Sequence, residues 1–181
     1  MKILFTHSYF YKLDAKQWRF KQPYPPLGTI LAASVMREQG YDVTLFDTNL
    51  KDDPGEIVPV LKQHRPKYMV LYDDGFNYLT KMCLTNMREA AFVMSTAGKQ
   101  SGCTVIVSSS DAADQYDKYF DHGVDYVVKG EGEETLKELI NTLEEGKDPS
   151  ALPGIVYRKN SVSVVTQPRP VLRDLDELPI P

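Results

Sequence analysis

The chain has 181 residues, 42% of them hydrophobic, which is enough for one sizeable core with an appendage but too little for two full domains. Its 21 basic and 25 acidic side chains are mixed along the chain and give a formal net charge of −4, so no charge pattern predicts nucleic acid or a membrane as a partner. No apolar run reaches the length of a membrane span, and the N-terminus turns polar at Thr6, too early for a signal peptide, so we expect a cytoplasmic protein.

Short apolar or β-branched runs alternate with helical patterns along most of the chain. We expect strands at residues 2–6, 42–47, 68–72, 104–108 and 125–128. We expect helices at residues 28–39, 55–64, 80–102, 114–121 and 133–145. Strict alternation predicts a parallel sheet with helices on both faces and right-handed crossovers. The fold class is therefore α/β, a flavodoxin-like (Rossmann-like) domain over residues 1–146 with a five-stranded parallel sheet in the order 2-1-3-4-5.

The two cysteines, Cys83 and Cys103, lack the C-x-x-C spacing of a zinc or redox site. Neither a disulfide framework nor a metal site is predicted, and both are typical of buried thiols.

The character of the chain changes after residue 146. The segment begins with the Pro/Gly linker "GKDPSALPG" and continues with "IVYRKNSVSVV", a predicted β-hairpin that turns at Asn160 and Ser161. It ends in the extended, proline-punctuated stretch "TQPRPVLRDLDELPIP". Because this tail has too little apolar content to fold alone, residues 147–181 are predicted to link the first domain to a second one.

Ligands of open α/β sheets bind beyond the carboxyl ends of the strands, where the strand order reverses. The residues just after each strand are therefore the candidates for a binding site. They are Thr6 and His7 after the first strand; Tyr72, Asp73, Asp74, Phe76 and Asn77 after the third; Ser108, Ser109, Ser110 and Asp111 after the fourth; and Gly130, Glu131 and Gly132 after the fifth. The stretch Pro26-Leu27-Gly28, which ends a proline-rich loop and opens the first helix, lies at the same edge.

Other ligands of this fold fit these loops less well. A phosphoacceptor receiver domain would use Asp73, Ser108 and Lys129, but the first loop has no carboxylate to complete a magnesium site. A flavin-mononucleotide carrier needs a small first loop that cradles phosphate, and this loop is bulky at residues 9–12. A G-x-G-x-x-G dinucleotide fingerprint is missing from the first turn. A non-catalytic signalling or interaction module, receiver-like or otherwise flavodoxin-like, stays the alternative function.

Small residues after the fourth and fifth strands allow two readings each. Ser108, Ser109 and Ser110 either leave a slot between sheet and helices for an elongated ligand or form a turn that caps the helix expected at Asp114. The turn at residues 130–132 either needs unusual backbone angles or lets a ligand approach closely. The prolines before Gly28 either hold a rigid wall against a ligand or pack the loop on the sheet.

Four stretches together resemble one family over essentially the whole chain. They are "PYPPLGTILAASVMREQGYDVTLFD", "SSSDAADQYDKYFDHGVDYVVKGEGEETLKELI", "LPGIVYRKNSVSVV" and "PRPVLRDLDELPIP". This ordered set is similar to the N-terminal cobalamin-binding domain of cobalamin-dependent radical S-adenosylmethionine enzymes. The resemblance implies that cobalamin binds to the loop residues named above and that the chain leads into a radical S-adenosylmethionine barrel.

The resemblance also implies the chemistry of an intact enzyme. In the family, a 4Fe–4S cluster cleaves S-adenosylmethionine, and cobalamin donates a methyl group or assists an oxidative cyclisation. The barrel's C-x-x-x-C-x-x-C motif does not occur in these residues, so we expect no catalytic group here and expect the chain's own barrel and cobalamin as its partners.

This sequence departs from the cobalamin carriers in two places. The D-x-H-x-x-G loop that supplies a histidine to cobalt is missing, and His7 lacks the preceding Asp that would orient it. The radical S-adenosylmethionine relatives commonly lack this histidine as well, so the resemblance implies cobalamin with its own base displaced and its lower face left to a residue or water from the loop at the end of the third strand, Tyr72 included. The relatives' glycine pair after the fourth strand is Ser108-Ser109 here, which narrows the slot.

Overall fold

The computed structural model describes residues 1–73, 84–174 and 178–181. Its central sheet has seven strands in the order β2-β1-β3-β4-β5-β6-β7. The strands are β1 (Lys2–Thr6), β2 (Asp42–Phe46), β3 (Tyr68–Tyr72), β4 (Thr104–Ser108), β5 (Tyr126–Val128), β6 (Ile155–Lys159) and β7 (Val162–Val165). The first five are parallel and keep the predicted order, whereas β6 and β7 are antiparallel.

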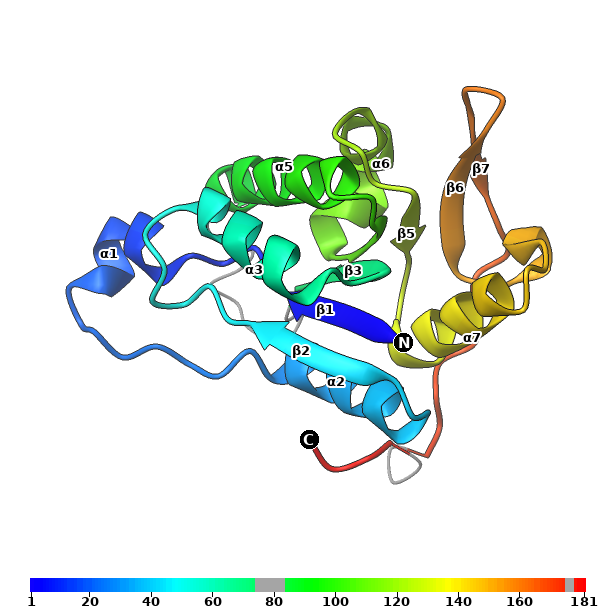
Figure 1. The fold of residues 1–181 in the computed structure, drawn as a ribbon, viewed down its shortest axis with the longest axis horizontal. Helices are drawn as coiled ribbons and strands as arrows, with labels where there is room; N and C mark the ends of the chain where they lie inside the picture. Colours follow the sequence, from blue (N-terminus) through cyan, green and yellow to red (C-terminus); the bar gives the residue numbers. More distant parts are fainter. Residues whose placement is uncertain (74–83, 175–177) are drawn as a thin grey trace.

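The helices cover both faces of this sheet (Figure 1). They are α1 (Ala15–Trp18), α2 (Leu27–Glu38), α3 (Ile57–His64), α5 (Leu84–Gln100), α6 (Ser110–Asp121) and α7 (Glu133–Glu144), with short 3-10 turns η1 (Tyr11–Leu13), η2 (Pro54–Glu56) and η3 (Pro149–Ala151). Among the described residues, no helix is both long and apolar enough to cross a bilayer.

Each face of the sheet has its own hydrophobic core. On one face, Leu4, Met69 and Val105 from the strands pack with residues of α3, α5 and α6. On the other, Ile3 and Val70 pack with residues of α2 and α7. Successive strand residues alternate between the two cores because side chains alternate across a strand, which is why the strands read as continuous apolar runs.

The prediction of a five-stranded sheet with a separate hairpin is wrong, because the hairpin joins the sheet edge. Val127 pairs with Val156 and Val128 with Ile155, and all four side chains are buried. The strand β5 would otherwise expose an unpaired edge, and an apolar antiparallel strand covers it. The predicted turn is confirmed, since Asn160 and Ser161 both have the positive φ of a tight hairpin turn.

The start of α6 differs from the expectation, and the start of the third expected helix is not described. Helix α6 begins at Ser110 instead of near Asp114, because the Ser109 hydroxyl accepts a hydrogen bond from the Ala112 N–H and caps the helix earlier. The described part of the third expected helix starts at Leu84, as residues 80–83 lie outside the described residues. Its end is as predicted, with Gly102 at φ +84°.

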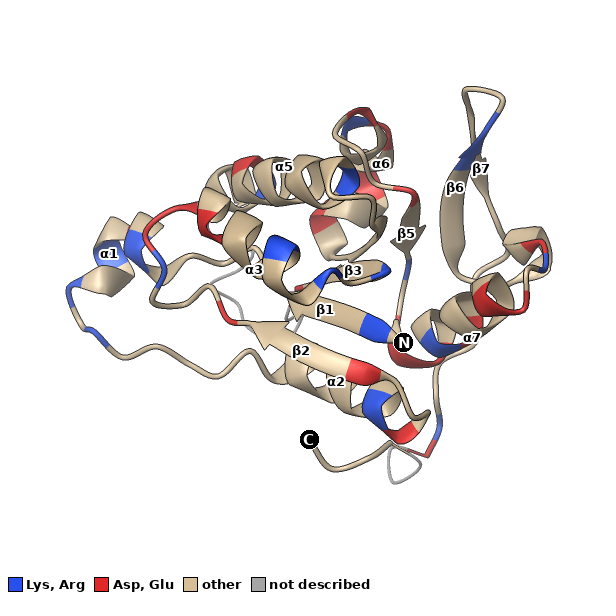
Figure 2. Ribbon diagram, in the orientation of Figure 1, with Lys and Arg blue, Asp and Glu red and all other residues tan. Residues whose placement is uncertain are grey.

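Basic and acidic residues occur together in α2, α5, α6 and α7 (Figure 2). Cys103 is a buried free thiol whose pKa is raised by burial, whereas Cys83 lies outside the described residues.

Candidate functional site

The carboxyl ends of β1, β3 and β4 form one connected rim. The Ser8 N–H and hydroxyl, just after β1, donate to the Asp73 carboxylate after β3 at 2.7 and 2.9 Å. The Asp73 N–H in turn donates to the Ser108 carbonyl at the end of β4 at 2.9 Å. The rim therefore holds the loops after three strands in fixed relative positions.

Asp73 is held in a setting that disfavours its charge. Burial raises the pKa of its carboxyl group, although the hydrogen bonds from Ser8 and the nearby His7 act in the opposite direction. Asp73 is a predicted site residue, and the structure places it at the rim. Ser8 was not predicted, because a serine 65 positions away leaves no local signal of its partner.

His7 lies inside the protein and not on the rim surface. Its Nε2 is 2.9 Å from Asp47 Oδ1, and its Nδ1 is 3.1 Å from the Thr48 hydroxyl. The Asp47 carboxyl is half-exposed; burial raises its pKa, but the bonds from His7 and Asn49 outweigh this and lower it. Both ring nitrogens of His7 thus have partners within the chain. Thr6 is likewise buried, and its hydroxyl donates to the Phe46 carbonyl at 2.9 Å.

Tyr72 occupies the space beneath the rim on the α2/α7 face. Its side chain belongs to the core on that face and is only 6% exposed. A Cβ placed on Gly132 would lie 2.8 Å from the Tyr72 hydroxyl oxygen and 3.0 Å from the Ser108 hydroxyl oxygen. The Thr29 hydroxyl of α2 donates to the Tyr72 carbonyl at 2.6 Å. Burial and the neighbouring Glu133 raise the pKa of the Tyr72 phenol.

The two glycines of the turn after β5 serve different purposes. Gly130 has φ +82° and open space where a Cβ would be, so it provides a left-handed backbone. Gly132 has an ordinary φ of −92° but lies against Tyr72 and Ser108, so it provides close packing. Between them, Glu131 accepts a hydrogen bond from the Leu172 N–H of the C-terminal tail at 2.9 Å.

The residues after β4 mainly organise α6. Ser109 is the N-cap of this helix, and Ser110 is its first, exposed residue. Asp111 accepts two hydrogen bonds from the Arg88 guanidinium at 2.8 and 2.5 Å and one from the Tyr119 hydroxyl at 2.9 Å. Burial alone would raise the pKa of Asp111, but these bonds outweigh it and hold the pKa below its usual range.

The proline-rich loop before α2 is fixed from the side of β2. The Asn49 side-chain amide donates to the Tyr24 carbonyl at 2.8 Å. Pro26 and Gly28 are buried, whereas Leu27 and Tyr24 are 54% and 59% exposed. The loop thus presents apolar side chains to solvent next to the rim.

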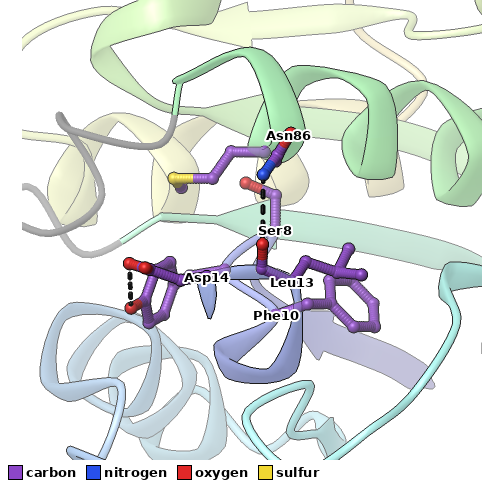
Figure 3. A pocket seen from close by; sticks show the side chains of 7 residues that line it. Ser8, Phe10, Leu13, Asp14 and Asn86 are labelled. Atoms are coloured by element: carbon purple, nitrogen blue, oxygen red, sulfur yellow. Dashed lines mark hydrogen bonds between the residues drawn. The ribbon is translucent and has the colours of Figure 1, made fainter. Parts of the chain in front are cut away.

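A small pocket lies beside the rim, near η1 and the start of α5 (Figure 3). It is lined by Ser8, Tyr9, Phe10, Leu13, Asp14, Asn86 and Met87. The Asn86 amide donates to the Leu13 carbonyl at 3.2 Å across it. With a cavity volume of about 10 Å³, it has room for about one water molecule, so it is not a cofactor pocket.

The structure brings most of the predicted site residues to one edge of the sheet. Tyr72, Asp73 and Ser108 contact one another or a shared neighbour there, and the turn at residues 130–132 adjoins them. Asp74, Phe76 and Asn77 lie outside the described residues. Arg88, like Ser8, was missed, because the charge it binds lies 23 positions away.

Comparisons with known proteins confirm the resemblance inferred from the sequence. No family model matches the chain. It is 29% identical to an uncharacterized methyltransferase of Pyrococcus horikoshii over 165 residues, which is 87% of this chain and 33% of the relative. It is 26% identical to the anaerobic magnesium-protoporphyrin IX monomethyl ester cyclase of Synechocystis, over 86% of this chain and 31% of the relative.

The fold is shared with part of a solved enzyme. The radical S-adenosylmethionine methyltransferase TsrM of Kitasatospora setae, with cobalamin and a [4Fe-4S] cluster bound, superposes with a TM-score of 0.69 at 17% identity, over 98% of this chain and 30% of TsrM. The chain thus spans about a third of the length of the curated relatives it matches.

Proposed function

We propose that the chain is the cobalamin-binding domain of a longer radical S-adenosylmethionine enzyme that transfers a methyl group or closes a ring. The observation that carries this proposal is similarity over more than four-fifths of the chain to a methyltransferase and a cyclase. The shared fold with cobalamin-bound TsrM supports it. The 4Fe–4S cluster and S-adenosylmethionine would belong to the remaining part of that enzyme.

The rim fits a corrin ring lying across the ends of the strands. A corrin is a wide, flat macrocycle with amide side chains, so it needs a broad surface with exposed backbone and polar groups. The turn at residues 130 and 131 and the start of α6 at Ser110 are exposed at this edge, and Asp73 follows β3, on the other side of β4 from that turn. Leu27 offers an apolar contact for the edge of the ring.

When bound, cobalamin would supply the cobalt-centred chemistry, while the residues of this chain bind and orient it. The Ser8–Asp73 hydrogen bonds would keep the loop after β1 below the ring. Asp73, which already accepts hydrogen bonds from Ser8, could hydrogen-bond an amide side chain of the corrin. His7 would act only by holding Asp47 and Thr48 in place.

An absorbance titration with hydroxocobalamin and methylcobalamin tests the proposal. We expect saturable binding of one corrinoid per chain, and with methylcobalamin a shift to the spectrum of the form whose base is displaced. If neither corrinoid binds this chain or the longer enzyme, the proposed function is wrong.

A His7→Ala variant tests the buried role of the histidine. We expect it to give the same bound spectrum as the wild type, because its ring nitrogens are already engaged by Asp47 and Thr48. A spectrum that changed in the variant, measured where circular dichroism shows it folded, would instead make His7 a cobalt ligand.

A further inference from the structure

The slot expected between the sheet and its helices is filled by a side chain of the protein itself. Strand β3 ends in Tyr72, whose ring enters the core formed by α2, α7 and the sheet. Val128 of β5 and Leu136 of α7 belong to the same core. This is the position at the carboxyl ends of β3 and β4 where small residues would leave room for an elongated ligand.

The ring of Tyr72 is closely packed against the turn after β5. Its hydroxyl oxygen and Cε2 would lie 2.8 and 2.9 Å from a Cβ on Gly132, so the ring packs directly on the Gly132 backbone. Ser108 closes the same space from β4 at 3.0 Å from that Cβ position. A bicyclic aromatic base could enter only if Tyr72 left, because protein interiors are close-packed.

The backbone of Tyr72 is held as firmly as its side chain. The Thr29 hydroxyl, fully buried at the start of α2, donates to the Tyr72 carbonyl at 2.6 Å. The next residue, Asp73, is bonded on one side to Ser8 and on the other to Ser108. These hydrogen bonds to α2, β1 and β4 fix the backbone from which the Tyr72 side chain enters the core.

We propose that Tyr72 closes the slot to the nucleotide tail of the corrinoid, so that the domain recognises the corrin ring alone. This inference rests on the proposed function. Cobalamin carries dimethylbenzimidazole on a nucleotide tail below the ring, and the ring can lie flat on the rim only if that base leaves the cobalt. With the slot closed, the displaced base gains no compensating contacts, so the tail contributes no binding energy. Tyr72 is then a residue that determines which corrinoid binds.

The test compares aquacobalamin with diaquacobinamide, a corrinoid that lacks the nucleotide tail. Dissociation constants of both are measured with the wild-type chain by absorbance titration. We expect cobinamide to bind at least as tightly as cobalamin, since only cobalamin must displace a base. Cobalamin binding more than about tenfold tighter would overturn the inference, because the tail would then be contributing contacts.

Two variants locate the effect at the ring of Tyr72. Tyr72→Ala opens the slot and is expected to shift the preference towards cobalamin by about tenfold. Tyr72→Phe keeps the ring and is expected to retain the wild-type ratio. A folded Tyr72→Ala variant with an unchanged ratio would also overturn the inference. If Tyr72→Ala does not fold, the ratio of the two dissociation constants measured with the wild-type chain still tests the inference.

The failures of the two proposals are distinguishable. Binding of both corrinoids with cobalamin much preferred would leave the proposed function intact and remove only the role of Tyr72. Binding of neither corrinoid to the chain or to the longer enzyme would remove both.

Discussion

Replacing Arg88 with Met is expected to lower the free energy of unfolding by about 2 to 3 kcal/mol at neutral pH. The Asp111 side chain is only 10% exposed and accepts two hydrogen bonds from the guanidinium. Methionine fills similar space but leaves this carboxylate with Tyr119 as its remaining hydrogen-bond donor among those described here. A part-buried charge without its counter-charge is strongly destabilising.

The stability lost in Arg88→Met should decrease as the pH falls. The folded state lowers the pKa of Asp111, so the stability that the pair contributes is fully present above the unfolded-state pKa of Asp, about 3.9. It disappears as the pH falls through the still lower folded-state pKa. The difference between wild type and Arg88→Met should therefore be largest near neutrality and shrink in acid. Urea unfolding at a series of pH values measures it.

Arg158→Met is the matched control for this prediction. Arg158 pairs with Asp121, whose side chain is 62% exposed, and exposed pairs contribute about 1 kcal/mol or less. Equal losses in the two variants, or a loss for Arg88→Met that is the same at every pH, would contradict the assigned role of the Arg88–Asp111 pair.

Replacing Gly132 with Ala is expected to lower the free energy of unfolding by about 1 to 3 kcal/mol. The φ of −92° suits alanine, so the loss comes from packing: the new Cβ would lie 2.8 Å from the Tyr72 hydroxyl oxygen and 2.9 Å from its ring. Because Tyr72 is buried and its carbonyl is held by Thr29, neither side can easily move.

A double-mutant cycle with Tyr72→Phe separates this packing effect from backbone strain. Removing the Tyr72 hydroxyl should restore part of the free energy of unfolding that Gly132→Ala loses. It should restore none of the free energy of unfolding that Gly130→Ala loses. Gly130 has open space but φ +82°, so its loss of about 1 kcal/mol comes from the backbone. Chemical denaturation of the five variants measures the coupling. Strict additivity between Gly132→Ala and Tyr72→Phe would show that the two residues are not in contact.

The parallel part of the fold was predictable because each strand is a continuous apolar run. Residues such as Met69 and Val70 face opposite cores, both buried, so the sequence pattern identifies a strand covered on two faces. The pairing of the hairpin with β5 was not predictable in this way. Apolar residues such as Ile155 and Val156 occur in isolated hairpins as well as in hairpins that join a larger sheet. Only the tertiary structure shows that these two pair with β5.

The edge that holds the candidate site was predictable from topology, but the partners within it were not. The order of the parallel strands places Asp73, Ser108 and Gly132 at one end of the sheet. The pairs Ser8–Asp73 and Arg88–Asp111 join residues far apart in sequence, so no local sequence pattern predicts them. The direction of the Tyr72 side chain follows from strand alternation, whereas its tight fit against Gly132 depends on the turn after β5.

Amide hydrogen exchange with and without excess hydroxocobalamin tests most directly whether a corrinoid binds at the rim. We predict slower exchange in the segments at the carboxyl ends of the strands, residues 109–111 and 129–132, because a bound ring would cover them. Residues 65–67 and 101–103, at the opposite edge of the sheet, should exchange at unchanged rates. Protection at the opposite edge, or binding with no protection at the rim, would contradict the account.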